Sequence, residues 1–106
     1  MIRIVLLLAV VACSSSGDDR AKVAIRHYGC GTCHDIPNLG GANGHVGPPL
    51  DNLATREYLA GRLTNTRDHL IQWIQHPQAV EPGTVMPEMG VTDRDAEDIA
   101  TFLTAP

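Results

Sequence analysis

The sequence predicts an all-α fold of about four short helices. Apolar residues recur at helical spacing in several segments, and no segment alternates apolar and polar residues as a half-buried strand does. The 106 residues are enough for one small domain, which excludes a multidomain enzyme. The apolar runs fall short of the ~18 residues that cross a bilayer. The net charge of −4, without basic patches or tails, argues against nucleic-acid binding.

The first twelve residues have the layout of a secretory signal peptide. Arg3 precedes the apolar run 4–11, and the small Ala12 follows it. Together with Cys13, this end of the run resembles a bacterial lipobox, in which the cysteine is acylated after cleavage. The alternative is ordinary cleavage, or an uncleaved anchor, with no role for Cys13. We therefore expect a removed signal peptide over 1–12, a lipidated cysteine and polar tether over 13–19, and the folded domain over 20–106.

The first helix is expected to end at Gly29 and to lead directly into a pair of cysteines. Its apolar residues lie at i, i+3, i+4 and i+7, which places them on one face. These residues are Ala21, Ala24, Ile25 and Tyr28. The segment 35–49 that follows holds too many glycines and prolines for a regular element. We expect an irregular loop there.

The middle of the chain is expected to form two more helices. One covers residues 55–60 and ends at Gly61, and the other begins after the capping residue Thr66 and is stopped by Pro77. The buried face of the second is expected to consist of Leu70, Trp73 and Ile74.

A further loop and a final helix complete the expected fold. Residues 77–91 contain several prolines and glycines and are expected to form the loop. Thr92 is a candidate N-cap, and Asp93 and Asp95 lie in the first turn, where the helix dipole favours acidic residues. The buried face is expected to consist of Ala96, Ile99, Ala100 and Leu103. The acidic run Asp93, Asp95, Glu97 and Asp98 is expected to be a solvated face.

The strongest motif is Cys30-Gly31-Thr32-Cys33-His34. Two thiols at this spacing can each bond one vinyl group of a haem, and the histidine that follows can bind the iron from one side. Three other interpretations compete: a zinc site, a redox-active thiol pair and a structural disulfide. A zinc site needs further ligands, yet no cysteine follows Cys33, and a thioredoxin-like pair needs a βαβ context that the pattern lacks. The motif therefore predicts one covalently attached haem c.

A second axial ligand is expected from the loop after the third helix. Met86 and Met89 are the candidates there, and Met86 follows a stiff turn formed by residues 82–85. Less favoured ligands are the histidines His45, His69 and His76. With His27, they are otherwise expected to be surface or loop residues.

The order of these pieces resembles the small class I cytochromes c over roughly residues 20–104. The resemblance depends on a first helix, Cys30-Gly31-Thr32-Cys33-His34, Gly47-Pro48-Pro49-Leu50, Arg56, a helix ending before Pro77, Pro82-Gly83-Thr84-Val85-Met86 and a C-terminal helix. Leu59-Ala60-Gly61 and Asn65-Thr66 are similar to stretches in the cytochrome c domains that accompany, or are fused to, bacterial terminal oxidases.

This resemblance implies a role for individual residues around the haem. His34 and Met86 would be the axial ligands, with Met89 packing on the haem rim. The other nitrogen of His34 would bond the carbonyl of Pro48, and Arg56 would pair with a haem propionate unless it is an exposed surface arginine. Further residues expected around the haem are Trp73 beside the iron–methionine pair, Thr84 in the preceding turn, and Leu50, Leu53, Ile74, Phe102 and Leu103 as apolar packing.

The resemblance implies a single-electron carrier, which is not an enzyme. It would cycle between Fe(III) and Fe(II) in a respiratory chain, on the periplasmic side of a membrane to which Cys13 anchors it. The expected partners are a membrane respiratory complex or terminal oxidase, or other cytochromes. Family members of the mitochondrial type dock through a ring of lysines, whereas this chain has only Lys22. Without Arg3 it has 7 Lys+Arg against 12 Asp+Glu, which favours a basic or neutral docking partner.

Two other functions fit parts of the sequence. A haem enzyme or gas-binding sensor would need an open or displaceable distal position, whereas the segment around Met86 offers mainly Pro, Gly and Met. An extracytoplasmic interaction module would use Cys30 and Cys33 as a reversible disulfide and would bind no haem. Carbon monoxide binding by the reduced protein would reveal the first, and a colourless purified protein the second.

Overall fold

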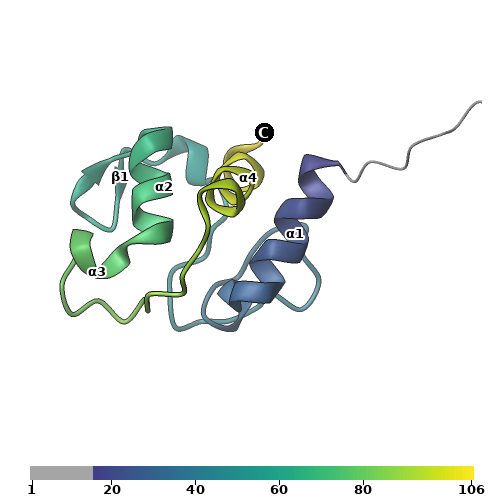
Figure 1. Ribbon diagram of the computed structural model, residues 1–106, viewed down its shortest axis with the longest axis horizontal. Coiled ribbons are helices and arrows are strands. Elements are labelled where there is room, and N and C mark those ends of the chain that lie inside the picture. The colour runs from purple at the N-terminus through teal and green to yellow at the C-terminus, as the bar shows by residue number, and fades with distance from the viewer. Residues whose placement is uncertain (1–15) are drawn as a thin grey trace, which may run out of the picture.

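The computed structural model describes residues 16–106, so the predicted signal peptide and Cys13 lie outside the described residues. The chain runs through α1 (Gly17–Tyr28), η1 (Cys30–Thr32), η2 (Leu53–Thr55), β1 (Tyr58–Leu59), β2 (Leu63–Thr64), α2 (Arg67–Gln75), α3 (Pro77–Val80) and α4 (Asp93–Thr104), where η marks a 3₁₀ turn. Helix α4 lies between α1 and α2 and contacts both (Figure 1). The fold is mostly helical, as predicted, with one very small sheet.

Helix α1 begins before residue 20, the predicted start of the folded domain. It ends at Gly29, as predicted. The hydroxyl of Ser16 accepts a hydrogen bond from the backbone N–H of Asp19 at 3.2 Å, which caps the first turn. Gly29 ends the helix in the left-handed conformation, with φ 73°. The expectation that residues 13–19 form a polar tether is therefore wrong for residues 17–19, because the cap at Ser16 makes them helical.

Helices α1 and α4 pack closely because their facing residues are small. The buried residues of the two helices are Ala21, Ala24, Ile25, Ala96, Ile99 and Ala100. Alanines on both sides let the two backbones approach, while the isoleucines fill the remaining space. Thr92 caps α4 as predicted, accepting a hydrogen bond from the N–H of Asp95 at 3.2 Å.

Two polar contacts join the same pair of helices. The hydroxyl of Tyr28 donates to a carboxylate oxygen of Asp95 at 2.6 Å, and the guanidinium of Arg20 bonds Asp98 at 3.1 Å. The expectation that the whole acidic run faces solvent is therefore wrong for Asp95 and Asp98, which bind side chains of α1 across the helix interface.

The predicted helix over 55–60 is wrong, because residue 55 ends η2 and residues 58 and 59 form strand β1 of a small hairpin. Strands β1 and β2 are antiparallel, with Leu59 opposite Leu63. Ala60 and Gly61 turn the chain with φ of 52° and 66°, values that a helix does not allow. The side-chain amide of Asn65 donates to the carbonyls of Leu53 and Arg56, both at 2.8 Å, and ties the hairpin to η2.

Helix α2 has the predicted cap and is followed by a further turn of helix. The hydroxyl of Thr66 accepts a hydrogen bond from the N–H of His69 at 3.2 Å, and Leu70 and Ile74 are buried as predicted. Pro77 does end α2, yet it also begins α3, since a proline is well tolerated in the first turn. The predicted loop over 77–91 is therefore wrong for residues 77–80 and holds for the remainder.

Candidate functional site

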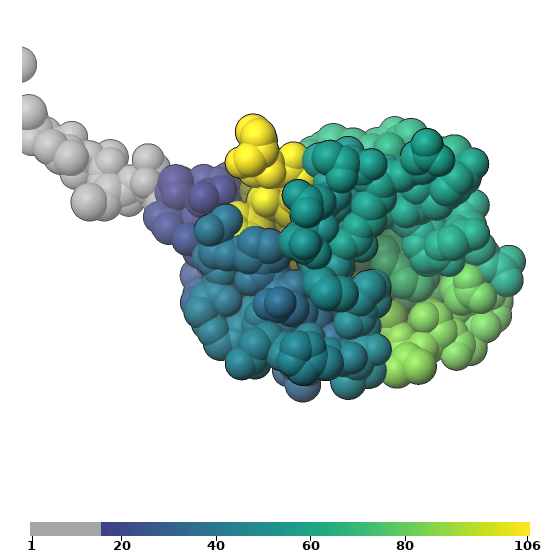
Figure 2. All heavy atoms as spheres, turned by 180° about the vertical axis from the view of Figure 1, so that it is seen from behind, coloured from purple at the N-terminus to yellow at the C-terminus, as the bar shows by residue number. Residues whose placement is uncertain are grey.

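A cavity of about 900 Å³ lies between the helices and the irregular segments and opens to solvent on one side. In Figure 2 residues coloured blue to teal cover much of one face, and the light-green segment after α3 lies beside them. Most residues expected around the haem line this cavity, among them Cys30, Cys33, His34, Pro48, Leu50, Leu53, Arg56, Trp73, Thr84 and Met86. The structure thus gathers residues from across the sequence around one space.

Cys30 and Cys33 are presented by the 3₁₀ turn that follows α1. The N–H of His34 donates to the carbonyl of Cys30 at 3.0 Å, which closes the turn and places both thiols on the cavity wall. Burial raises the pKa of the Cys30 thiol. The loop from 35 to 49 packs tightly on this turn, since a Cβ at Gly44 would lie 2.2 Å from the carbonyl oxygen of Thr32. A larger residue at position 44 would force the loop away.

The ring of His34 is held from two directions. Its Nδ1 makes the expected hydrogen bond with the carbonyl of Pro48, at 2.7 Å, so Nδ1 carries the proton. Nε2 is thereby left as the nitrogen with a free lone pair, the form that binds a metal. A Cβ at Gly47 would lie 2.4 Å from Cε1 of the ring. Glycine at position 47 therefore lets the backbone pass directly against the imidazole.

Both candidate methionines reach the cavity, in different environments. Met86 and Met89 line it and are half-buried. Met89 also packs against the buried hydrophobic core, together with residues of the helices. This packing gives Met89 a structural role, whereas Met86 lines the cavity and is not among the residues packed against the core. None of His27, His45, His69 and His76 is among the cavity-lining residues.

The backbone around Met86 is held by Gln78, a residue that the sequence did not single out. The side-chain nitrogen of Gln78 donates to the carbonyls of Thr84 and Met86, at 2.7 and 2.9 Å. Its side-chain oxygen accepts a hydrogen bond from the N–H of Gly83 at 3.1 Å. No local sequence pattern distinguishes this glutamine from the others, because its partners lie in a loop without periodicity.

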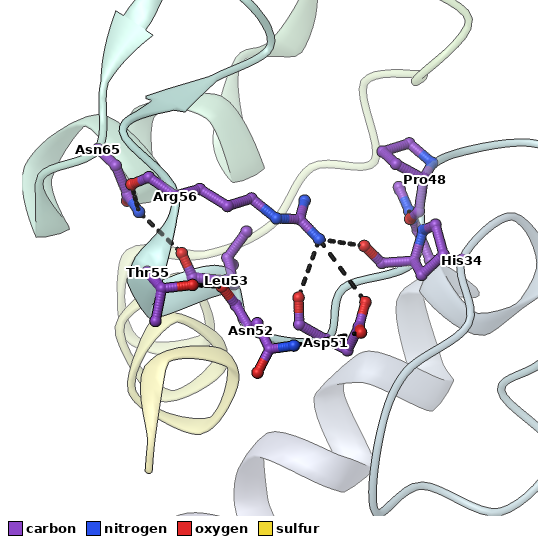
Figure 3. A network of polar contacts seen from close by, with 9 residues as sticks. His34, Pro48, Asp51, Asn52, Leu53, Thr55, Arg56 and Asn65 are labelled. Atoms are coloured by element: carbon purple, nitrogen blue, oxygen red, sulfur yellow. Dashed lines mark hydrogen bonds and ion pairs between the residues drawn. The ribbon is translucent and has the colours of Figure 1, made fainter.

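Arg56 lies at the edge of the cavity, close to the bond between His34 and Pro48 (Figure 3). Its guanidinium donates to the carbonyls of Pro49 and Asp51, the second at 3.0 Å. The Asp51 carboxylate is 3.9 Å away. The side chain of Arg56 is about one-third exposed, at 32%. A cation is thus fixed by backbone carbonyls at a border between cavity and solvent.

The apolar wall agrees with the prediction except at one residue. Trp73 is half-buried and lines the cavity, as do Leu50, Leu53, Ile74 and Leu103. Phe102 does not line it, so its expected place beside the haem is wrong. Its ring instead faces α1, where the Nζ of Lys22 lies 6.0 Å from the ring centre. Phe102 and Leu103 are neighbours on a helix and point in different directions, which accounts for the difference.

The donor set on the cavity wall suits a haem better than a bare metal ion. Within residues 16–106 there is no group of three or more His, Cys, Asp or Glu side chains that could hold a metal ion, as a zinc site would need. A large apolar cavity with two thiols, an oriented imidazole and thioethers on its wall matches a covalently attached iron porphyrin.

Among the helices of the described residues, none is long and apolar enough to span a membrane.

Comparison with known proteins agrees with this geometry. The family model for cytochrome c matches residues 20–105. Subunit 2 of cytochrome c oxidase from Alkalihalophilus pseudofirmus is 35% identical over 86 residues, which are 80% of this chain and 24% of that protein. The chain thus spans about a quarter of the length of that relative. This chain therefore belongs to the cytochrome c family and binds one haem c covalently, through Cys30 and Cys33.

Proposed function

We propose that this cytochrome c is a single-electron carrier with His34 and Met86 as axial ligands of its haem. The observation that carries the proposal is the arrangement of three kinds of ligand around one cavity: the attaching thiols, an imidazole whose Nε2 is left free by its bond to Pro48, and the thioether of Met86. Met89 is disfavoured as the ligand because it packs against the core. The haem supplies reversible Fe(III)/Fe(II) chemistry.

Ligation from both sides separates a carrier from a haem enzyme. With His34 and Met86 both bound, no position on the iron is open to a substrate or a gas. The apolar wall, including Trp73 and Leu53, excludes water and favours the less charged ferrous state, as a thioether ligand also does. These two features suit a carrier of high reduction potential.

Arg56 supports the same assignment from the edge of the cavity. Its guanidinium is fixed by the carbonyls of Pro49 and Asp51 and remains partly exposed. We infer that it pairs with a haem propionate there, since a planar guanidinium binds carboxylates through two parallel hydrogen bonds.

Electrons are proposed to leave where the cavity meets the surface. Val46 and Val85 line the cavity and yet are 67% and 79% exposed, so they mark an apolar rim around the haem edge. A rim of this kind suits brief contact with a redox partner. The oxidase subunit among the relatives supports a terminal oxidase as that partner, and the acidic chain favours a basic or neutral docking surface on it.

Membrane tethering through Cys13 remains part of the proposal. It is supported by the lipobox-like sequence alone, since residue 13 lies outside the described residues. A tether to the periplasmic side of a membrane would keep the carrier near its partner and raise their effective concentration. The intact mass of the protein purified from membranes tests this: a mature chain that begins at an acylated Cys13 is expected, and an unmodified one would rule it out.

The axial ligands are tested with haem-loaded protein. We expect the oxidised wild type to show the sulfur-to-iron charge-transfer band at the red end of the spectrum, and Met86→Ala to lose it. Met89→Ala is the matched control and is expected to keep the band. If Met86→Ala keeps it, the ligand is another residue. If the wild type lacks it and the reduced protein binds carbon monoxide readily, the protein is a haem enzyme or a gas sensor.

A further inference from the structure

We propose that Gln78 is the positioning residue for the distal side of the haem: its side-chain amide fixes the loop that presents Met86 to the iron. The inference rests on the proposed function, in which Met86 is the ligand. It concerns a different residue, outside the cavity lining and on another element, α3.

The amide of Gln78 uses its hydrogen-bonding capacity on this one loop. Both hydrogens of the NH₂ group have an acceptor, the carbonyl of Thr84 at 2.7 Å and that of Met86 at 2.9 Å. The amide oxygen accepts from the N–H of Gly83 at 3.1 Å. Three backbone groups within four residues, ending at Met86 itself, are thereby bound to a single side chain.

The loop has little other support of its own. Between residues 82 and 87 of the described chain, one hydrogen bond joins backbone to backbone, from the N–H of Thr84 to the carbonyl of Glu81 at 3.0 Å. Gly83 has φ 83°, a conformation that glycine adopts without steric cost, and Val85 is largely exposed. Without the three bonds from Gln78, few interactions would select one conformation of this segment.

Gln78 is itself well anchored. It follows Pro77, which is almost completely buried at the start of α3. The backbone N–H of Gln78 donates to a carboxylate oxygen of Glu88 at 3.0 Å, on the far side of Met86. The segment that carries Met86 is thus tied to α3 before and after the methionine.

Anchoring matters because the bond from a neutral thioether to ferric iron is weak. A ligand of this kind stays bound when the protein holds it in place beforehand. Loosening the loop would increase the fraction of molecules in which Met86 is detached. An external ligand binds only to that fraction, so its apparent affinity reports the population directly.

The test measures imidazole binding to the oxidised, haem-loaded protein at neutral pH, together with the red charge-transfer band. Gln78→Glu has almost the same shape but cannot donate to the carbonyls of Thr84 and Met86. Gln78→Ala removes all three bonds. Since one typical hydrogen bond shifts an equilibrium by about fivefold, we expect both variants to bind imidazole at least about tenfold more tightly than the wild type, with a weaker band.

The matched control is Gln72→Glu, which makes the same change on the exposed side of α2. We expect its imidazole affinity and its band to equal those of the wild type. If Gln78→Glu and Gln78→Ala also match the wild type while Met86→Ala loses the band, Gln78 does not position the ligand and the proposed ligation stands. If Met86→Ala retains the band, the ligation and the role of Gln78 are both refuted.

Discussion

The contact between α1 and α4 and the wall of the haem cavity are built in opposite ways. The two helices meet through buried alanines and isoleucines and are joined by Tyr28–Asp95 and Arg20–Asp98. The cavity of about 900 Å³ is lined in part by the irregular segments 35–50 and 81–91 and in part by helix residues, among them Ile25 and Ile99. One region is packed by protein against protein, and the other needs the haem to complete its packing.

This difference explains how a chain of 106 residues can be stable although much of its backbone is irregular. A small domain buries a modest fraction of its surface and commonly needs a cofactor or a cross-link for stability. Here the haem supplies the missing apolar contacts. The helix pair lines the cavity with Ile25 and Ile99, but its alanine contacts and its two polar bridges are made within the protein. Loss of the haem and loss of a helix contact should therefore affect different parts of the molecule.

The largest effect is expected from removing the haem with Cys30→Ala and Cys33→Ala together. The haem supplies much of the apolar packing of this small domain, and domains are stable by only ~5–15 kcal/mol. We expect thermal unfolding to lose its cooperativity. Hydrogen exchange should show residual protection in α1 and α4 and none in 35–50 or 81–91. Equal protection in all segments would show that the haem does not stabilise the cavity wall more than the contact between α1 and α4.

A middle-sized effect is expected from Gly47→Ala, which disturbs the wall alone. The new Cβ would lie 2.4 Å from the His34 ring, so the ring or the backbone must move. Overpacking of this kind costs about 1–3 kcal/mol. Denaturant unfolding of the haem-loaded protein measures the loss. Gly40→Ala is the control in the same loop, with no atom within 4 Å of its Cβ. A similar loss in both variants would mean that contact with His34 is not the cause.

The smallest effect is expected at the helix pair, from Asp98→Asn. The guanidinium of Arg20 lowers the pKa of the Asp98 carboxyl. The ionised form therefore stabilises the folded state above the ordinary aspartate pKa of about 3.9. That contribution is lost as the pH falls through the lowered pKa. We expect Asp98→Asn to melt slightly below the wild type at pH 6 and equally at the lowest pH where both fold. A difference independent of pH would exclude the ion pair as its source.

The helical frame was predictable because its signals are local. The caps Thr66 and Thr92, the terminal Gly29 and apolar residues at helical spacing predicted α1, α2 and α4 to within a few residues, although the Ser16 cap of α1 was missed. The hairpin was missed because strands of two residues are too short to show alternation. The partners of Asp95 and Asp98 were also missed, since they lie 67 and 78 positions away in the sequence.

The site was predictable to the extent that its residues are adjacent or belong to a known pattern. The spacing of Cys30, Cys33 and His34 predicts haem attachment once the lack of further cysteines and of a βαβ pattern disfavours the zinc and thioredoxin-like alternatives. Pro48 and Arg56 came from the family resemblance, and the structure brings both to the cavity. Gln78 and the close contact of Gly47 with His34 depend on loops that meet only in the folded chain. No sequence pattern around Gln78 or Gly47 predicts these contacts.

The turn between β1 and β2 contains a residue, Ala60, whose identity is expected to depend on whether the protein binds haem. Ala60 adopts the left-handed conformation, which costs a residue with a Cβ about 1–2 kcal/mol, and it also lines the cavity. The backbone alone would favour glycine or asparagine at position 60, whereas a place on the wall of an apolar cavity favours a methyl group. A descendant that no longer bound haem would lose the reason to keep alanine. Replacement of Ala60 by glycine or asparagine would then be an early mark of a lineage that had abandoned its cofactor.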